Sequence, residues 1–408
     1  MATLTLDTGR SAINQQRRRG LSNARPGRQT KFQEVCGRLS DLAHELGPDA
    51  KLPTVIELRD RLGVSIATLN SVLTELESQR VVRRRHGVGI YVAPDIRQHR
   101  VALICDPSFF HAAGTSPFWS LLVDQLRRRA EAEREAFSMY FATAPTDSRH
   151  GDYRSDDLGT ILPYLGESLI EELKNGRMDA VLGIGLPQVT ADWIERQGIP
   201  FVAFAGPAQY VVGLDGDEVV RQGVAVLCGL DCKRIAYWSP IAPYRHTTPE
   251  AESEAVNLFA ETLSAHGRRF DPDLVWDNQH LVPGSGGIHT LSHQEQGYHA
   301  AMEAFGTHTD RDDWPDAIFS TDDMLTQGLL TALQRLEVRV GTDVQIATHA
   351  NAGSPVLLGW EDRLTRLEVS PAQVVCEMFD AVEALLHGKE PKAEVICVPP
   401  RLRPIGEL

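Results

Sequence analysis

The chain has 408 residues, more than one hydrophobic core ordinarily organises, so two or three folding units are expected. It is 42% hydrophobic and 24% charged, as globular proteins are, and no apolar run approaches the roughly 20 residues that span a bilayer. With no apolar segment of a secretory signal at its start, a cytoplasmic location without a membrane partner is expected.

The net charge of −14 divides unevenly along the chain. Residues 1–100 carry 17 Lys and Arg against 10 Asp and Glu, a net charge of +7, which leaves 24 against 45, or −21, for residues 101–408. The basic N-terminal part could bind phosphate groups, and the acidic remainder would be repelled by them. The same charge difference would also be expected if the acidic residues only kept the large domain in solution.

The first elements in chain order are a tail and two helices. Residues 1–30 are polar and rich in arginine, without a hydrophobic period, and are expected to form a disordered basic tail. Apolar residues then recur at helical spacing over residues 32–46. Thr54 and Glu57 have the spacing of a capping box, which predicts a second helix that ends at Gly63.

A third helix and a hairpin complete this unit. Ser65 is placed to cap the third helix, so the second and third helices form a helix-turn-helix. Residues 81–85 and 90–92 read as two short strands around a glycine-containing turn. The sequence therefore predicts a winged helix-turn-helix domain over residues 31–93, followed by a linker over residues 94–99.

The third helix opens with short polar side chains near its positive end, which suits a helix that contacts base edges in the major groove. Three arginines of the wing would contact the DNA backbone or the minor groove. The expected DNA-binding residues are Thr54, Ser65, Ala67, Thr68, Asn70, Ser71, Arg83, Arg84, Arg85, Gly87 and Gly89. Taken singly, each feature would also fit an ordinary helix start or a solvated strand edge.

This segment resembles the winged helix of the GntR family. The resemblance rests on Leu52-Pro53, Thr54, Glu57-Leu58, Leu62 to Ser65, Thr68, Leu76-Glu77, Val82 and Arg84 to Val92. It implies binding to double-stranded operator DNA. That family often has arginines where this chain has Ile66 and Asn70, so no operator sequence can be carried over.

From residue 100 onwards, buried strands alternate with helices, a pattern that predicts parallel sheets covered on both faces and an α/β fold. The expected strands are 101–105, 137–141, 180–184, 201–204, 211–214, 234–238, 317–320 and 344–347. The helices between them include 118–133, 218–230, 251–266 and 324–336. About eight strands favour two sheets, and residues 145–168 read as an inserted loop.

Residues 100–408 resemble the effector-binding domain of LacI/GalR-type regulators, a periplasmic-binding-protein-like fold. The resemblance rests on Ser116 to Trp119, Met178 to Val181, Gly198 to Val202, Val212 to Asp215, Arg234 to Ala236, Pro315 to Phe319, Asp322-Asp323, Gly328, Gly341 to Val344 and Val398 to Leu402. It implies two subdomains with parallel sheets, crossovers near residues 238, 368 and 397, and a ligand in the cleft between the subdomains.

A sugar-like effector would need polar partners for its hydroxyl groups and an aromatic face for its ring. By resemblance, the expected effector-binding residues are Phe118, Trp119, Asp215, Arg245, Asp322 and Asn351. Phe118 and Trp119 could instead be core residues, and the Asp322-Asp323 pair could be a helix cap. The family's clamping arginine aligns with Glu252, with Arg245 nearby, and Asn351 stands in for a family aspartate.

These features predict a DNA-binding transcriptional regulator, a repressor, that acts as a homodimer and responds to a small sugar-like effector. The alternatives are a sensor of another metabolite such as a nucleoside, a sugar receptor without regulation, and an enzyme with a DNA-binding head. No catalytic residue is expected, because no nucleophile elbow, P-loop or aldimine-forming lysine is recognisable. The six cysteines lack metal-site spacing, so neither a metal nor a cofactor is expected.

Overall fold

The computed structural model describes residues 31–406 except 79, 86, 95, 97–98, 108, 110–115, 133–134, 144–162, 241–248, 278–290 and 307–312. The tail expected over residues 1–30 lies outside the described residues. So do Arg245 and most of the loop expected over residues 145–168.

The N-terminal unit is a winged helix. It contains α2 (Lys31–Leu46), α3 (Val55–Leu62), α4 (Ile66–Ser78), β1 (Val82–Arg85) and β2 (Gly89–Val92). The two strands pair antiparallel, and the apolar positions of all five elements meet in one buried cluster that includes Val35, Leu39, Leu58, Leu69, Leu73, Leu76, Val82 and Val92. The predicted helix-turn-helix and wing are confirmed.

The turn between α3 and α4 follows from its caps. Thr54 accepts a hydrogen bond from Glu57 N, and the Glu57 carboxylate accepts one from Thr54 N, so the capping box is complete. Gly63 ends α3 in the left-handed region at φ 62°, where a residue without a Cβ is unstrained.

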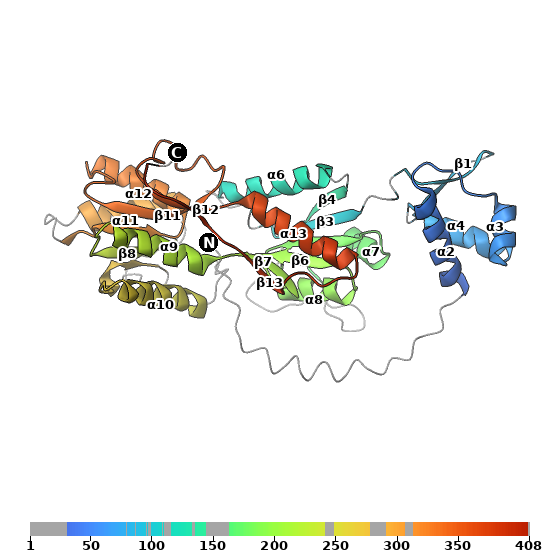
Figure 1. Cartoon of the computed structure of the whole chain (residues 1–408), viewed down its shortest axis with the longest axis horizontal. Coiled ribbons are helices and arrows are strands. Elements are labelled where there is room, and N and C mark those ends of the chain that lie inside the picture. The colour runs from blue at the N-terminus through green and yellow to red at the C-terminus, as the bar shows by residue number, and fades with distance from the viewer. Residues whose placement is uncertain are drawn as a thin grey trace, which may run out of the picture.

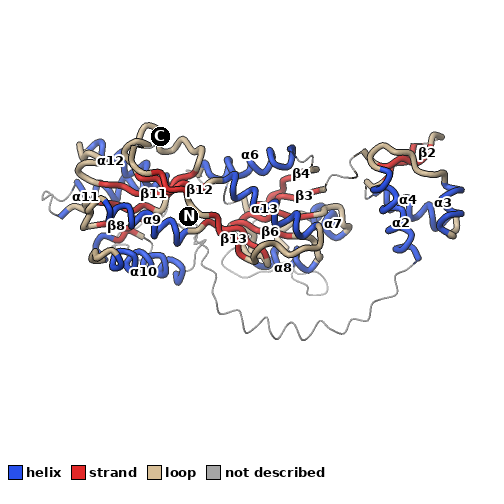
Figure 2. Tube along the Cα trace, viewed as in Figure 1, coloured by secondary structure: helices blue, strands red, loops and turns tan. Residues whose placement is uncertain are grey.

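The first sheet of the large domain has the strand order β13-β7-β6-β5-β3-β4, and all its pairs are parallel. Its strands are β3 (Arg100–Cys105), β4 (Ala136–Phe141), β5 (Ala180–Ile184), β6 (Phe201–Phe204), β7 (Tyr210–Leu214) and β13 (Val395–Val398). It is covered by α6 (Pro117–Ala132), α7 (Glu167–Lys174), α8 (Gln188–Arg196) and α13 (Pro371–Leu386). Figure 2 shows the helices around the strands of each sheet.

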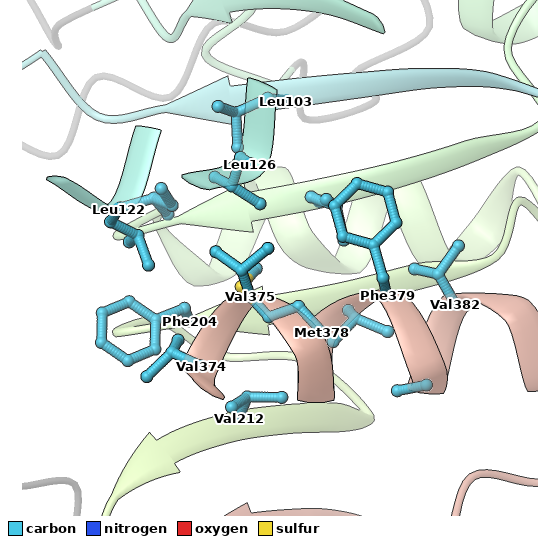
Figure 3. Close-up of a cluster of buried hydrophobic side chains, with 14 of the residues drawn as sticks. Leu103, Leu122, Leu126, Phe204, Val212, Val374, Val375, Met378, Phe379 and Val382 are labelled. Atoms are coloured by element: carbon cyan, nitrogen blue, oxygen red, sulfur yellow. The ribbon is translucent and has the colours of Figure 1, made fainter. Parts of the chain in front are cut away.

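Both faces of the central strands of this sheet are buried, so β5 and β6 are apolar throughout. Val101 and Leu103 pack on one side with residues of α6 and α13, and Ala102 and Ile104 pack on the other side with α7 and α8. Figure 3 shows α13 against the first of these faces, with Met378 and its neighbours directed toward the strands.

The second sheet has the order β14-β12-β11-β10-β8-β9 and is parallel except for β14. Its strands are β8 (Ile235–Trp238), β9 (Val275–Trp276), β10 (Ala317–Ser320), β11 (Gln345–Asn351), β12 (Thr365–Val369) and β14 (Arg401–Arg403). One face is covered by α9 (Gly216–Gly229) and α10 (Pro249–Ala265), and the other by α11 (His293–Gly306) and α12 (Asp323–Arg335). A short helix, η2 (Pro272–Leu274), precedes β9.

The chain passes between the two sheets three times (Figure 1). The crossing predicted near residue 238 is wrong, because β8 already lies in the second sheet; the chain crosses at Asp215, between β7 and α9. It returns at Ser370, where α13 joins the first sheet, and crosses again at Pro399-Pro400. The last two positions lie close to the expected 368 and 397.

Candidate functional site

One face of α4 is exposed and the other is buried. The exposed residues are Ile66, Ala67, Asn70, Ser71, Thr74 and Ser78, which follow each other at spacings of one, three and four and form one continuous stripe. Leu69, Val72, Leu73 and Leu76 face the core. The helix therefore presents a single outward surface, which includes the expected DNA-binding residues Ala67, Asn70 and Ser71.

Several polar groups at the start of α4 are already hydrogen-bonded within the helix. Ser65 accepts from Thr68 N at 3.0 Å, and the two hydroxyl groups lie 2.9 Å apart. The Ser71 hydroxyl donates to Ala67 O at 3.1 Å, and the Thr74 hydroxyl donates to Asn70 O at 2.9 Å. The Asn70 side-chain amide, by contrast, has no hydrogen bond to another described residue.

The three wing arginines contact different partners. Arg83 is paired with Asp49. Arg84 donates from Nε to the Glu77 carboxylate at 2.8 Å and from its backbone N–H to the same carboxylate at 2.9 Å, and these bonds lower the pKa of Glu77. The Arg84 side chain thus fastens the wing to α4. The Arg85 guanidinium lies over the Tyr91 ring, 5.0 Å from its centroid.

The tip of the wing depends on two glycines. Gly87 and Gly89 have φ of 72° and 142°, and a Cβ on Gly89 would lie 2.9 Å from Lys51 Cε. The two glycines carry no side chain, so another backbone can approach the tip of the wing closely at these positions.

Thr54, expected to bind DNA, has a structural role as the cap of α3. Thr54→Ala should lower the free energy of unfolding of the winged helix by about 1 kcal/mol, because a first-turn N–H loses its acceptor. Thr54→Ser keeps the hydroxyl and should unfold like the wild type, as measured by chemical denaturation followed by circular dichroism. Equal losses in both variants would contradict this role.

An aromatic group gathers at the carboxyl edge of the first sheet. The ring centroid of Trp119 lies 4.3 Å from that of Phe109, 5.2 Å from that of Phe118 and 6.0 Å from that of Phe204, the last residue of β6. Phe118 is buried in the core, as the alternative interpretation had it, whereas Trp119 is half-buried. Phe109 covers Gly185, where a Cβ would overlap its ring at 1.9 Å.

A polar group gathers at the carboxyl edge of the second sheet. Asp322 caps α12 by accepting from Leu325 N at 2.8 Å, and its other oxygen lies 3.3 Å from His293 Nδ1. Burial alone would raise the pKa of Asp322, but His293 and the backbone bond hold it well below its usual range. Asp322 is therefore both the expected helix cap and an anionic side chain at this edge.

Asp323 and His349 are buried beside it. The Asn351 amide donates to Asp323 Oδ2 at 2.9 Å, but Asp323 Oδ1 and both ring nitrogens of His349 have no hydrogen-bonding partner in the described part of the chain. Burial, and then the Asp322 carboxylate, raise the pKa of Asp323 to about 7, and burial lowers that of His349 to about 4. Buried polar atoms without partners are costly, so they point to a polar ligand at this edge.

The two edges approach each other through the segment that follows β11. A Cβ on Gly353 would lie 4.0 Å from Leu121 Cδ2 of α6, the helix that carries Trp119. Asp215, expected on the rim, caps α9 at the first crossing by accepting from Glu218 N at 3.0 Å. Of the expected effector residues, Trp119, Asp322 and Asn351 thus lie at the two edges.

Four residues of these edges were not predicted: Phe109, His293, Asp323 and His349. Three of them had a signal in the sequence, because Phe109, Asp323 and His349 lie at or just after the end of a buried strand, where parallel sheets carry their ligand-binding residues. His293 had no such signal. It begins a helix whose place beside α12 depends on the packing of the two helices.

The raised pKa of Asp323 predicts a pH dependence of stability. The uncharged form is favoured in the folded state, so its contribution is present below pH 4 and is lost as pH rises through 7. His349 has the opposite sign, because its folded form is already neutral while its unfolded form still releases a proton near pH 6.5. Its contribution therefore rises by about 0.4 kcal/mol between about pH 6.5 and 8, equally in any variant that keeps His349. Over the same range the contribution of Asp323 itself should fall by about 1 kcal/mol.

Asp323→Asn should abolish this loss, because the amide oxygen still accepts from Asn351 and does not ionise. Denaturant unfolding monitored by tryptophan fluorescence at both pH values measures the difference. A wild type and a variant that decline equally would contradict the assignment of the titration to Asp323.

Two further properties concern the described residues only. None of their helices is long and apolar enough to cross a membrane. No three of their His, Cys, Asp and Glu side chains are grouped in a way that could hold a metal ion.

Comparison with known families matches two parts of the chain. Residues 34–92 match the family described as bacterial regulatory proteins, gntR family, and residues 224–404 match the periplasmic binding protein-like domain. No curated protein matches the chain in sequence.

Solved structures share the fold. The transcription regulator CcpA of Lactococcus lactis (15% identity, TM-score 0.53) and the transcription regulator GntR of Chromobacterium violaceum (18%, 0.52) each cover 76% of this chain, with 99% of their own length aligned. The transcriptional regulator CelR in complex with cellobiose (20%, 0.52) covers 93% of this chain with its whole length.

Proposed function

We propose that the chain is a two-part regulator, with a winged helix that matches the gntR family of bacterial regulatory proteins and a periplasmic binding protein-like domain, and that it represses transcription under the control of a sugar-like effector. The main support is that one chain combines two features. The winged helix has an exposed face on α4, and the large domain has buried polar groups, at Asp323 and His349, without a hydrogen-bonding partner in the described part of the chain.

The DNA-binding part of the proposal rests on α4 and the wing. The winged helix also exposes the basic residues Lys31, Arg61 and Arg85, and Lys31 Nζ donates to Gly63 O in the turn before α4. Such residues can neutralise phosphates while the helix lies in the major groove. We assign the expected DNA-binding residues to this surface, with Thr54 and Arg84 holding the helix and the wing in place. Such a regulator acts on the chromosome, hence in the cytoplasm.

The effector part rests on the two sheet edges. Trp119 offers a half-buried aromatic ring at the edge of the first sheet, and Asp323, His349 and Asn351 offer hydrogen-bonding groups at the edge of the second, the combination that a polyhydroxylated ring requires. CelR, which shares this fold, was solved with cellobiose. We therefore place a sugar-like ligand between these edges, where it would hold the subdomains in one arrangement and so bias operator binding.

We further propose that the regulator is a homodimer. One winged helix contacts only one half-site, and two of them on one assembly multiply the specificity. Sedimentation of the full chain should give twice the mass of one chain; a monomer that still binds a two-fold symmetric operator tightly would contradict this.

Thermal unfolding of the full chain against a panel of mono- and disaccharides, nucleosides and amino acids tests the effector. A ligand at a hundredfold its dissociation constant should stabilise the protein by about 2.7 kcal/mol. Trp119→Ala and Asp323→Asn should each abolish the shift, whereas Asp273→Asn, an exposed acid before β9 at the opposite edge of the sheet, should keep it. Stabilisation by a nucleoside alone would refute the sugar assignment and leave the DNA-binding part standing.

A further inference from the structure

The helix face that would enter the major groove has an unusual composition. No residue of α4, from Ile66 to Ser78, is Lys or Arg, although all of them are described. Ile66, the first residue of the helix, is 46% exposed and belongs to no hydrophobic cluster of the winged helix. An exposed isoleucine beside Ala67 gives the leading end of this face an apolar surface.

The three arginines of the wing are engaged by partners of their own. Arg84 is held by two hydrogen bonds to Glu77 and a third, of 3.1 Å, to the Thr74 hydroxyl. Arg83 is paired with Asp49, and Arg85 is stacked on Tyr91. The hydroxyl groups of Ser71, Thr74 and Ser78 on the stripe already donate to backbone carbonyls. The Asn70 amide has both a donor and an acceptor and makes no hydrogen bond within the described part of the chain.

These side chains match one kind of base pair. Guanine presents two acceptors in the major groove and is read by the donors of Arg or Lys, which α4 lacks. Adenine presents an acceptor and a donor, which an Asn amide matches, and thymine presents a methyl group, which an apolar side chain covers. Ile66 and Asn70 are one helical turn apart, roughly 6 Å, so they would reach positions within about two base pairs of each other.

Given the proposed DNA-binding function, we propose that α4 reads A·T base pairs, with Asn70 on an adenine and Ile66 and Ala67 on thymine methyl groups. The phosphate contacts that supply most of the affinity come from residues around α4, and the helix itself supplies the discrimination. Operators of this protein should therefore have an A·T step, without an essential guanine, at the centre of each contacted half-site.

The experiment selects duplexes from a random library with the full chain and then replaces each thymine of the selected half-site by uracil, which removes only the C5 methyl group. One uracil position should weaken wild-type binding about threefold to fourfold, the effect of about one lost buried methyl group. The same replacement should have no effect on Ile66→Ala, because its contact is already missing.

Asn70→Ala should bind the selected duplex about tenfold more weakly and no longer prefer adenine at one position, and Asn70→Arg should select guanine there. Ser78→Ala, on the same stripe two turns later, is the control and should keep wild-type selection, since its hydroxyl is bonded to Glu75 O. Ile66, Asn70 and Ser78 are all exposed, so their substitution should leave the winged helix folded. The uracil duplexes also test the wild-type protein directly, so a folding defect of a variant cannot hide the result.

The outcomes separate this inference from the function on which it rests. A selected half-site with an essential guanine under α4, or uracil duplexes that bind as well as thymine duplexes at every position, overturns the A·T assignment while the DNA-binding function stands. Failure to select any sequence overturns both.

Discussion

Gly328→Ala should destabilise the second subdomain by about 3 kcal/mol or more, because the added methyl group would meet backbone and not a movable side chain. A Cβ on Gly328 of α12 would lie 1.8 Å from Gln294 O of α11, and one on the facing Gly297 would lie 2.0 Å from Leu325 O. The two helices can approach this closely only where both lack a side chain.

Gly306→Ala is the matched control. Gly306 is the last residue of α11, and its Cβ would make ordinary contacts, the nearest at 3.5 Å to the Leu336 side chain. Denaturant unfolding followed by tryptophan fluorescence should show a large loss for Gly328→Ala and none for Gly306→Ala. Similar midpoints for the two variants would mean that α11 and α12 do not pack through these glycines.

The second large effect is expected in the winged helix. Leu69 of α4 is fully buried in the cluster that the helices and the wing share, so Leu69→Ala should lower the free energy of unfolding by about 2–5 kcal/mol. A unit of about 60 residues has a small free energy of unfolding, so a loss of this size should leave the winged helix largely unfolded and unable to bind DNA.

The positions of the tryptophans allow unfolding of the large domain to be followed separately from unfolding of the winged helix. All six lie beyond residue 100, so their fluorescence reports on the large domain alone. Leu69→Ala should abolish amide protection in α4 and leave the fluorescence transition unchanged, whereas Ile56→Ala, a truncation at a 61% exposed site, should change neither. A fluorescence transition that shifts with Leu69→Ala would show that the two parts do not unfold independently.

The winged helix could be predicted almost completely from the sequence because its signals are local. The capping box at Thr54, the left-handed Gly63 and the glycines of the wing each fix a few neighbouring residues. Eight strands of the large domain were likewise visible as apolar runs, but β9, β12, β13 and β14 were not among those expected. In β12, Arg366 and Glu368 interrupt the apolar pattern.

The sequence could not show which residues far apart in the chain contact one another. Nothing local places β8 in the second sheet, so the first crossing was expected some twenty residues too late. Nothing near Arg84 in sequence marks it as bound to Glu77, and Asp322 could equally have been a cap or a ligand-binding residue. The strand ends marked Asp323 and His349 as candidates, but that both are buried at one edge became apparent only once β10 and β11 were paired.

Operator affinity measured with and without a stabilising ligand tests the central claim most directly. We would use fluorescence anisotropy with the full chain, a duplex selected from the random library, and a sugar that raises the unfolding midpoint. We expect this sugar to change the operator dissociation constant by at least about fivefold, a coupling of about 1 kcal/mol. An affinity that is the same with and without the sugar, or a protein that selects no duplex, would contradict it.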